Sequence, residues 1–495
     1  MRGGVVRRLT VVAISASIAA LPATLADAAT APPPEQASFG VASLYPDYDP
    51  QVHDYVVRCN DAPVTVQAHA SDPWQIAVDD DPFQSGDFSD EVPLGAGRGF
   101  TVSVEATDGQ QLHRYHVRCL PSDFPTYSFT RNGPVSPEFF TADSAYTPVE
   151  GRRYAMIFDN RGVPLWWYQV QARAVGPRVL ANGNILWFRS NGEASRYEIH
   201  RLDGSEVRPL HTVGRAPVDS HDVQLLGNGD YLIGAHVKQS HVDTSAYGGS
   251  SDAEVGNATL QEIGTDGGLV WEWNSQDHIS LAETGRWWPY AIDHPALYGY
   301  DVVHWNSIEP DGGSVIASFR HLDAVYEIDK TTGQIAWKLG GTPTPESLVV
   351  RRDPNRFTLG GQHDARLLGD GTLSVLDNRT YLTDPRPRMA RYRVDQAAGT
   401  ATLLESLSDP DVPASFCCGS ARRLPNRDWL IDWGQGSEGS QKSGAIGGYA
   451  PDGERTFLLS FDSTFSYRAQ PVPQGAVTRQ ALRKGMTAMC SPGCR

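Results

Sequence analysis

The chain has 495 residues, of which 40% are hydrophobic, and a formal net charge of −16. It is too long for one simple domain and long enough for a large core plus a smaller module. The negative charge argues against nucleic acid and an anionic membrane surface as partners, so any anionic substrate needs local positive groups.

The first segment, residues 1–28, has the three parts of a signal peptide. Arg7 and Arg8 are basic, residues 9–20 are apolar but too short for a membrane span, and residues 26–28 fit a cleavage site. The arginine pair leaves a twin-arginine route open beside the ordinary secretory one. Removing three arginines and one aspartate with this segment lowers the net charge from −16 to about −18. We therefore expect a secreted, extracytoplasmic protein without a membrane span.

A proline-rich linker, residues 29–37, leads into a segment with strand-like alternation. Residues 38–121 contain runs such as PVTVQAHA and FTVSVEATDG, which predict a small β-sandwich of the cadherin or immunoglobulin kind. Cys59 and Cys119 end two similar runs, and we pair them in a disulfide, as an exported chain allows. Three pairings stay open for the other four cysteines: Cys417, Cys418, Cys490 and Cys494.

Between residues 122 and 475 one hairpin recurs: a strand, a polar turn with glycine, and a second strand. The six copies are YAMIFDNRGVPLWW, YEIHRLDGSEV, LQEIGTDGGLVWEW, VYEIDKTTGQIAWKL, RYRVDQAAGTATLLE and GGYAPDGERTFLL. Five shorter frames lie between them and begin at Val175, His221, His304, His363 and Gly419. This alternation predicts an all-β fold with a six-bladed β-propeller, four strands to each blade. Residues 466–473 supply the sixth inner piece, and residues 476–495 form a disulfide-bonded tail.

Three of the five inner frames open on a histidine: His221, His304 and His363. In a propeller, equivalent positions of the inner strands face one another across the central channel. The frame is therefore structural, and the three histidines are a site added to it. Asp222 and Asp364 directly follow two of them, so we expect these carboxylates to point away from the channel and hold backbone groups.

Positive charge accompanies the histidines. Arg320 lies as far beyond its turn glycine as His304 lies before it, which makes the two predicted cross-strand neighbours. The same count places Arg379 opposite His363. Asn306 points the same way as His304, because strand side chains repeat every two residues.

Two other interpretations concern metal and packing. Three histidines are also a zinc-binding set. Arginines would repel a cation, and no carboxylate occupies the matching frame position of another blade, so we expect no metal. An insertion at residues 275–300 is interpreted as a lid over one mouth of the channel. Within it, Trp287 and Trp288 are either packing residues or the lining of an aromatic substrate pocket.

The blocks VVHWNSIEPDGGSVIASFRHLDAVYEIDKTTGQIAWKLGG and FTLGGQHDARLLGDGTLSVLDN resemble the arylsulfotransferase family, and the resemblance extends over residues 154–473. It implies a secreted six-bladed propeller that moves a sulfuryl group between phenols without a nucleotide donor or other cofactor. It also implies that His363, in the QHD motif, is transiently sulfated. His304, Asn306, Arg320 and His221 match the family's other site residues. The N-terminal module and the Trp-rich insertion mark a divergent branch.

The leading hypothesis is a ping-pong aryl sulfate sulfotransferase that acts on a small aryl sulfate donor and a phenolic acceptor. Sulfuryl transfer, like phosphoryl transfer, passes through a loose transition state, which asks for a nucleophile and fixed donors. A neutral imidazole supplies the nucleophile. Two alternatives stay open: another enzyme class on the same site (an isomerase, a lyase or a sulfate-ester hydrolase), and a non-catalytic anion-binding propeller. The N-terminal module also leaves a homodimer open.

Overall fold

The computed structural model is mostly β-structure. It describes Met1 and residues 36–60, 62–145, 153–170, 173–190, 192, 194–214, 217–436 and 443–490. Apart from Met1, the predicted signal peptide lies outside these residues, as does nearly all of the linker. No helix in the described part of the chain is long and apolar enough to cross a membrane.

Two small sheets occupy the N-terminal part. One has the order β1 (Ala37–Val41), β3 (Val64–Ala70) and β5 (Gly86–Val92); the other has the order β2 (Asp54–Arg58), β7 (Leu112–Leu120), β6 (Gly99–Ala106) and β4 (Trp74–Val78). Alternate residues of β3 and β7 are buried, as the sequence pattern predicts, and form an apolar core with β6. The predicted disulfide joins Cys59 to Cys119 at the ends of the parallel strands β2 and β7.

Six further sheets each contain four antiparallel strands within the described residues, and three of them carry a fifth strand. In order across each sheet, the strands of the first two are β11 (Pro164–Val170), β10 (Arg153–Asp159), β9 (Phe139–Asp143), β34 (Gln470–Pro471), and β12 (Arg173–Val179), β13 (Ile185–Ser190), β14 (Arg196–His200), β15 (Glu206–Leu210). The third and fourth sheets contain β16 (Val218–Leu225), β17 (Tyr231–Val242), β18 (Ala253–Ile263), β19 (Leu269–Asn274), with β20 (Tyr300–Asp301) beside β18, and β21 (Trp305–Asp311), β22 (Ser314–Phe319), β23 (Ala324–Asp329), β24 (Ile335–Gly340). The last two contain β26 (His363–Leu367), β27 (Leu373–Asp377), β28 (Arg388–Asp395), β29 (Thr400–Leu407), β25 (Val349–Arg351), and β30 (Ser420–Arg423), β31 (Trp429–Gln435), β32 (Gly444–Tyr449), β33 (Arg455–Phe461), β8 (Tyr127–Arg131).

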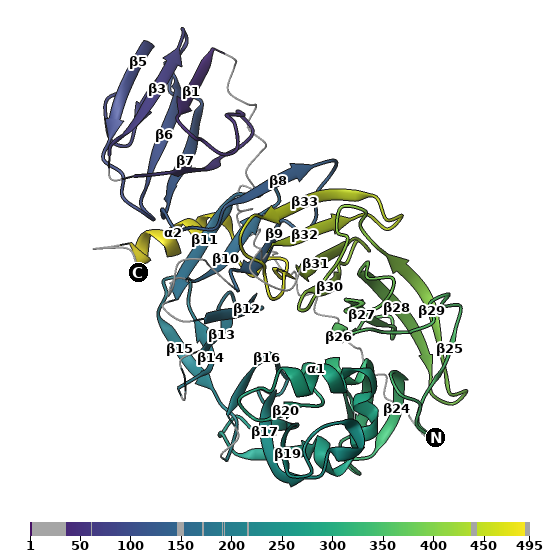
Figure 1. Cartoon of the computed structure of the whole chain (residues 1–495). Helices are drawn as coiled ribbons and strands as arrows, with labels where there is room; N and C mark the ends of the chain where they lie inside the picture. Colours follow the sequence, from purple (N-terminus) through teal and green to yellow (C-terminus); the bar gives the residue numbers. More distant parts are fainter. Residues whose placement is uncertain are drawn as a thin grey trace.

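Figure 1 shows these sheets following one another around a common centre, with β12, β16, β26 and β30 on the inner side. The six predicted hairpins are the outer pairs β10–β11, β14–β15, β18–β19, β23–β24, β28–β29 and β32–β33. The five predicted frames are the inner pairs, from β12–β13 to β30–β31. The predicted C-terminal piece also joins a sheet, because β34 pairs with β9.

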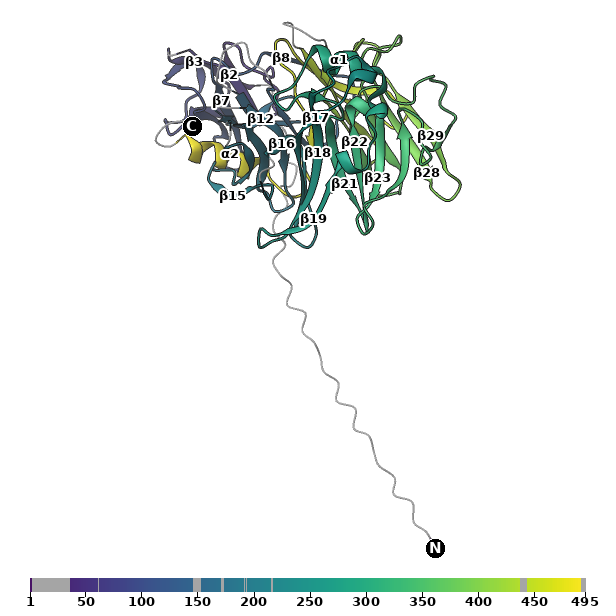
Figure 2. The ribbon, with the colours of Figure 1, turned by 60° about the horizontal axis from the view of Figure 1, so that its bottom comes forward.

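The insertion at residues 275–300 forms short helices: η2 (Ser275–Asp277), η3 (Leu281–Trp287) and α1 (Trp288–Asp293). Figure 2 shows α1 at one end of the strands. Two ion pairs fix the insertion to β24 and to the residue that precedes β23. Lys338 Nζ lies 2.6 Å from the buried Glu283, and Arg286 binds Asp323 through two nitrogens at 2.6 and 2.9 Å. Two other short helices are η1 (Ser245–Tyr247) and η4 (Arg320–Leu322).

The C-terminal tail contains a helix that the sequence interpretation missed. Helix α2 spans Arg479–Met489, and the Thr478 side chain caps its first turn. Leu482, Met486 and Met489 form its buried face and pack in the core that contains Trp166. This spacing is the apolar stripe of a short amphipathic helix, a signal that the sequence does contain.

Candidate active site

The inner strands are irregular at the frame positions, and these irregularities set the direction of the site residues. The register shifts between Val218 and Val223, between Trp305 and Ser307, and between His363 and Arg366. His304 and Asp364 have positive φ angles, 47° and 58°. β-Bulges of this kind re-aim side chains and are frequent beside active sites. The two frames without histidine have glycines with positive φ near this place, Gly176 and Gly419.

His221 and His304 are each held by a carboxylate that precedes them in the chain. His304 Nδ1 lies 2.5 Å from Asp301 Oδ2, and His221 Nδ1 contacts Asp219 Oδ1. Their ring centres are 4.9 Å apart. An ionised carboxylate only accepts hydrogen bonds, so Nδ1 of each ring carries the hydrogen and, in the neutral ring, Nε2 keeps a lone pair. The arrangement is the carboxylate–imidazole pair that orients a proton-transfer group.

Burial and their mutual interaction shift the pKa values of His304 and Asp301. Burial lowers the pKa of His304 to about 4, although Asp301 acts in the opposite direction. Burial alone would raise the pKa of Asp301, but His304 and His321 outweigh it and hold that pKa below its usual value. His304 is therefore neutral and Asp301 ionised near pH 7.

His363 is buried and has one defined tautomer. Its Nδ1 lies 2.8 Å from Asn378 Oδ1 and 3.1 Å from the Gly361 carbonyl oxygen. Asn378 Nδ2 donates to Ser415 Oγ and the Cys418 carbonyl, which fixes the orientation of this amide. Both neighbours of Nδ1 are thus acceptors, so Nδ1 carries the hydrogen and Nε2 the lone pair. Nε2 accepts a hydrogen bond of 3.2 Å from the Cys418 backbone N–H.

Arg320 lies between the histidines as a buried cation. It is 3% exposed, and its backbone N–H donates to the His304 carbonyl at 2.8 Å, which confirms the predicted neighbours. Its Nη1 lies 2.7 Å from His321 Nε2, and its Nη2 donates to the Phe416 carbonyl at 3.0 Å. Among the described residues no carboxylate forms an ion pair with Arg320, and burial lowers its pKa. Burial and Arg320 together hold the pKa of His363 well below its usual value.

The predicted neighbour of His363 is wrong. His363 pairs with Leu376 across the turn, and Asn378 rather than Arg379 reaches its ring. The guanidinium of Arg379 instead binds the Asp384 carbonyl at 2.8 Å and lies 3.5 Å from Asp377. The count fails for two reasons: Leu367 pairs with Leu373, which centres the hairpin on residue 370 rather than on Gly371, and the bulge beside His363 shifts the register by one more residue.

Asn306 and the two predicted anchoring aspartates lie behind the histidines. Asn306 Nδ2 donates to the Gln362 carbonyl at 2.7 Å and so holds the residue before His363. Asp222 and Asp364 accept backbone N–H groups of Ile308 and Ala421, as expected.

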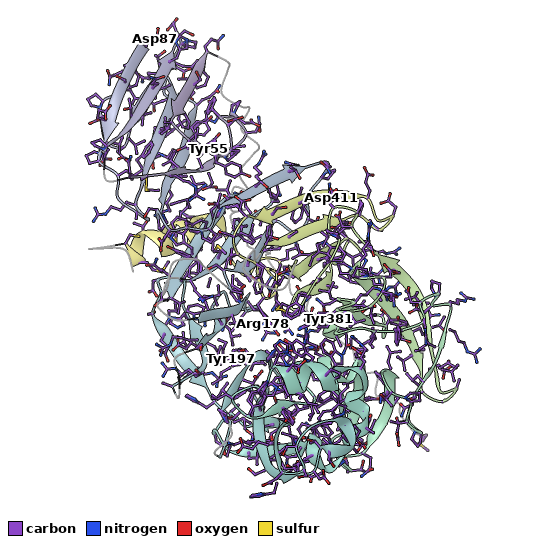
Figure 3. The ribbon with its side chains drawn as sticks, in the orientation of Figure 1. Tyr55, Asp87, Arg178, Tyr197, Tyr381 and Asp411 are labelled. Carbon is purple, nitrogen blue, oxygen red and sulfur yellow. A yellow bond between two sulfur atoms is a disulfide. The ribbon has the colours of Figure 1, made fainter. Side chains whose placement is uncertain are left out.

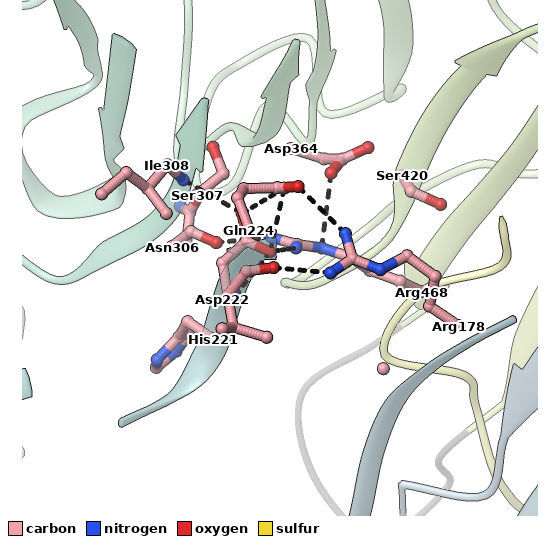
Figure 4. Close-up of polar contacts among 12 residues, drawn as sticks. Arg178, His221, Asp222, Gln224, Asn306, Ser307, Ile308, Asp364, Ser420 and Arg468 are labelled. Atoms are coloured by element: carbon pink, nitrogen blue, oxygen red, sulfur yellow. Dashed lines mark hydrogen bonds and ion pairs between the residues drawn. The ribbon is translucent and has the colours of Figure 1, made fainter. Parts of the chain in front are cut away.

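The same two aspartates also centre a buried ion network. Arg366 lies 2.6 Å from Asp222 and 2.9 Å from Asp364. Arg468 lies 3.1 Å from Asp222 and 3.5 Å from Asp364 (Figure 4). These four residues come from three separate parts of the chain, so the network joins several of the sheets at their inner edges.

Of the two predicted tryptophans, only Trp287 reaches the site. Its ring lies 4.6 Å from the ring of His321 and 4.5 Å from the Arg320 guanidinium, and its Nε1 donates to Asp323. Trp288 stacks on Tyr247 at 4.6 Å, away from the histidines. Both side chains are buried. Trp287 packs against the Arg320 guanidinium, and Trp288 is a packing residue.

Three other aromatic residues surround Arg320 and were missed from the sequence. Tyr290, Tyr381 and Phe416 form a chain of rings with centres 5.9 Å apart, and Arg320 lies 5.2 Å from the Phe416 ring. Tyr381 is 54% exposed and lies toward the centre of the ring of sheets (Figure 3). The three come from α1, the segment after β27 and the segment before β30, so no common spacing marks them. Together they offer an aromatic surface beside a buried cation.

The structure also shows part of the disulfide pairing that the sequence leaves open. Cys417 and Cys418 form a disulfide between adjacent residues, which selects one of the three possible pairings. Cys490 is disulfide-bonded as well.

The site also has carboxylates that the sequence interpretation overlooked when it weighed a metal. Asp219, His221 and His236, and likewise His236, Asp301 and His304, place ligand atoms within 4.8 Å of one another. No carboxylate occupies the matching frame position of another blade, as noted from the sequence, but Asp219 and Asp301 approach the histidines from other positions. Each carboxylate here already binds a histidine Nδ1, and the absence of a metal stays a prediction.

The buried histidines predict how stability depends on pH. Burial lowers the pKa of His304 to about 4 and holds the pKa values of His321 and His363 well below normal. Below about pH 6.5 these histidines bind protons in the unfolded chain but not in the folded protein. The free energy of unfolding therefore falls as pH falls, by about 1.4 kcal/mol per pH unit for each such histidine. Burial opposes protonation of His236, but Asp219 outweighs it and raises that pKa, so His236 is protonated in both the folded and the unfolded state below about pH 6 and does not change the slope there.

We therefore expect a net loss of about 2–4 kcal/mol per pH unit between about pH 6 and pH 4.5. Urea unfolding followed by tryptophan fluorescence measures it. The His304→Gln variant should show a shallower slope, and a stability that is flat or rises toward acid pH would contradict the assignment.

Comparisons with known proteins complete the description of the site. A family model described as Arylsulfotransferase (ASST) matches residues 129–458. No match is found among curated proteins. Among solved structures, an auxiliary nutrient binding protein from Bacteroides ovatus is 11% identical with a TM-score of 0.32, covering 87% of this chain and 90% of its own. A quinonprotein alcohol dehydrogenase-like protein from Bacteroides thetaiotaomicron is 9% identical with a TM-score of 0.31, covering 87% and 98%. Likeness at this level carries no argument about activity.

Proposed function

This chain belongs to the arylsulfotransferase family, and from that premise we propose that it is an exported aryl sulfate sulfotransferase. The sulfuryl group passes from an aryl sulfate donor to His363 and from His363 to a phenolic acceptor. His221 and His304 move the proton, Arg320 holds the sulfuryl oxygens, and Asn306 is a positioning residue.

The proposed scaffold is a six-bladed β-propeller at residues 122–475, preceded by a separate module at residues 38–121. The pairing at the two ends supports closure of the ring: β8 pairs with β33, and β34 pairs with β9. Strands from both ends of the propeller would then complete neighbouring blades. Closure places all the inner strands around one channel, where equivalent positions meet.

One observation carries the proposal: a buried guanidinium with no carboxylate ion pair among the described residues lies beside His363, whose Nε2 carries a lone pair that only a backbone N–H now contacts. Burying an arginine without an anion is unfavourable, so Arg320 favours an anionic ligand. The same burial keeps His363 neutral and nucleophilic. A sulfate monoester brings the anion that Arg320 lacks and the electrophilic sulfur that His363 needs.

In the first half-reaction, His363 Nε2 attacks the sulfur of the donor. The N–S bond forms, the bond between sulfur and the aryl oxygen breaks, and the phenolate leaves with the electron pair of that bond. The proton for the phenolate comes from the imidazolium form of His221, which Asp219 stabilises, while the neutral ring of His304 lies 4.9 Å from it. The Cys418 N–H, which now caps Nε2, becomes free to bind a sulfuryl oxygen beside Arg320.

The second half-reaction reverses these steps with a different phenol. The acceptor oxygen attacks the sulfur, the N–S bond breaks, and the acceptor proton returns to the His221–His304 pair. Asp219 and Asp301 stabilise the imidazolium that forms, because each accepts the Nδ1 hydrogen of its histidine. The rings of Tyr290, Tyr381 and Phe416 offer stacking to both aryl groups.

A fluorogenic umbelliferyl sulfate tests the function. We expect steady release of umbelliferone only when a phenol is added, with an equal amount of sulfated phenol formed. Without a phenol, release should stop after one turnover, because the sulfuryl group stays on the enzyme.

The other outcomes separate the alternative functions. Continuous release without an acceptor identifies a sulfate-ester hydrolase. Saturable binding of the ester without any release identifies an anion-binding protein. Neither binding nor release leaves the isomerase and lyase hypotheses, and removes the sulfotransferase.

A further inference from the structure

A cleft of about 660 Å³ lies between the N-terminal sheet, the start of β11 and helix α2, and His221, His304 and His363 are not among the residues that line it. One wall is formed by strands β6 and β7, and the other by the exposed side of α2. Its volume is in the range of a site for a small organic ligand.

The cleft is lined with basic side chains. They are Arg114, His116, Arg118, Arg483 and Lys484. Asp54 is the single acidic residue among those that line it. Two bonds of 2.6 and 2.7 Å join Asp54 to Arg483, and Arg479 lies 3.2 Å away, so its charge is already neutralised.

Three cations therefore remain without an acidic partner. Among the described residues no ion pair forms with Arg114, Arg118 or Lys484. Arg118 uses its guanidinium on the Gly97 carbonyl at 2.7 Å and on Thr487 Oγ1 at 3.3 Å, both uncharged. Burial lowers the pKa of Arg118 to about 10, since its charge is taken out of water without a full partner. This excess is notable in a chain with a net charge of −16.

Neutral donors accompany the charges. Burial, followed by the charge of Arg483, lowers the pKa of His116 to about 4, so its ring is neutral near pH 7. It lies 3.3 Å from Thr101 Oγ1. The two walls are held together by the ion pairs from Asp54 to α2, so the backbone segments that carry the cations are fixed relative to each other before any ligand arrives.

We propose that this cleft binds a polyanionic ligand whose charges are sulfate or phosphate esters. Three unpaired cations match a ligand with two or more negative charges, and arginine forks suit the oxygens of such esters. A local positive cleft on an acidic protein also concentrates such a ligand against the overall field. The site does not depend on the activity proposed for the histidines.

Isothermal titration calorimetry of the full mature chain tests the proposal. The probes are a heparin-derived tetrasaccharide for sulfate esters, inositol hexakisphosphate for phosphate esters, and maltotetraose as an uncharged control. We expect one or both anions to bind, more weakly at higher salt, and maltotetraose not to bind. The stronger of the two anions identifies the ester.

Variants then locate the site. The double variant Arg114→Gln with Lys484→Gln changes two exposed side chains and should weaken binding by about tenfold or more. Arg393→Gln removes an exposed arginine from β28, outside the cleft, and should leave binding unchanged. The proposal is overturned if neither anion binds, if maltotetraose binds equally well, or if Arg393→Gln weakens binding as much as the double variant.

Discussion

Replacing His363 with glutamine should abolish the first turnover of an aryl sulfate. The wild-type protein, mixed with donor and no acceptor, should release one phenol per molecule and gain about 80 Da, the mass of one sulfuryl group, on the peptide that contains His363. Glutamine keeps much of the side-chain size but has no nucleophilic nitrogen, so burst and adduct should both disappear. Steady turnover should fall by at least about a thousandfold. Stopped-flow fluorescence and peptide mass spectrometry measure the two effects.

The control for this variant is His278→Gln. His278 stacks on Trp273 at 5.1 Å, outside the site, and its replacement should leave the burst intact. Circular dichroism of both variants checks the fold. A burst that survives in His363→Gln, or an adduct on His221 or His304, would show that a different histidine is the nucleophile.

Replacing Asp222 with asparagine should lower the free energy of unfolding by about 3–5 kcal/mol, the usual loss when one member of a buried ion pair is removed. Burial would raise the pKa of Asp222, but Arg366 and Arg468 outweigh it and hold that pKa well below normal. Without the charge, two buried guanidinium groups lose their closest shared anion. Urea unfolding followed by tryptophan fluorescence measures the loss.

Asp411→Asn is the matched control. Asp411 also pairs with an arginine, 2.8 Å from Arg455, but its side chain is 60% exposed. Exposed pairs of this kind contribute up to about 1 kcal/mol. The same substitution should therefore have a small effect at Asp411 and a large one at Asp222. If Asp222→Asn stayed within about 1 kcal/mol of wild type, the network would not be a stabilising element.

Much of the fold was predictable because its signals are local and repeated. The six outer hairpins each carry a turn glycine. The turn requires a positive φ, 81° at Gly204, which residues with a side chain rarely adopt. A Cβ there would also lie 3.1 Å from Met489 of α2. The proximity of His221 and His304 followed from their equivalent frame positions.

The same counting failed for the hairpin of β26 and β27. His304 and Arg320 are neighbours as predicted, although β21 also has a register shift. In β26 and β27 the hairpin is centred on residue 370 and a bulge follows His363, so Asn378 takes the place expected for Arg379. No residue pattern in the frame announces a bulge at Asp364. The size of a register shift depends on packing between strands, which the sequence of one strand does not contain.

The carboxylates were within reach of the sequence. Asp219 stands two residues before His221 and Asp301 three before His304, and an aspartate so close to a candidate catalytic histidine is a signal for an orienting pair. The aromatic surface was not within reach. Tyr290, Tyr381 and Phe416 come together only in three dimensions, from segments without a shared period.

The buried ion network has a kinetic consequence. Asp222, Asp364, Arg366 and Arg468 are buried together, and Asp222 and Asp364 directly follow His221 and His363 in the chain. In the proposed enzyme we therefore expect substrates to reach the histidines only from the side opposite to this network. The phenol released from the donor has to leave through the same entrance by which the acceptor phenol arrives, and the two aryl groups occupy the same binding site in turn. Excess acceptor should therefore crowd out the donor, and the enzyme should run fastest at an intermediate acceptor concentration.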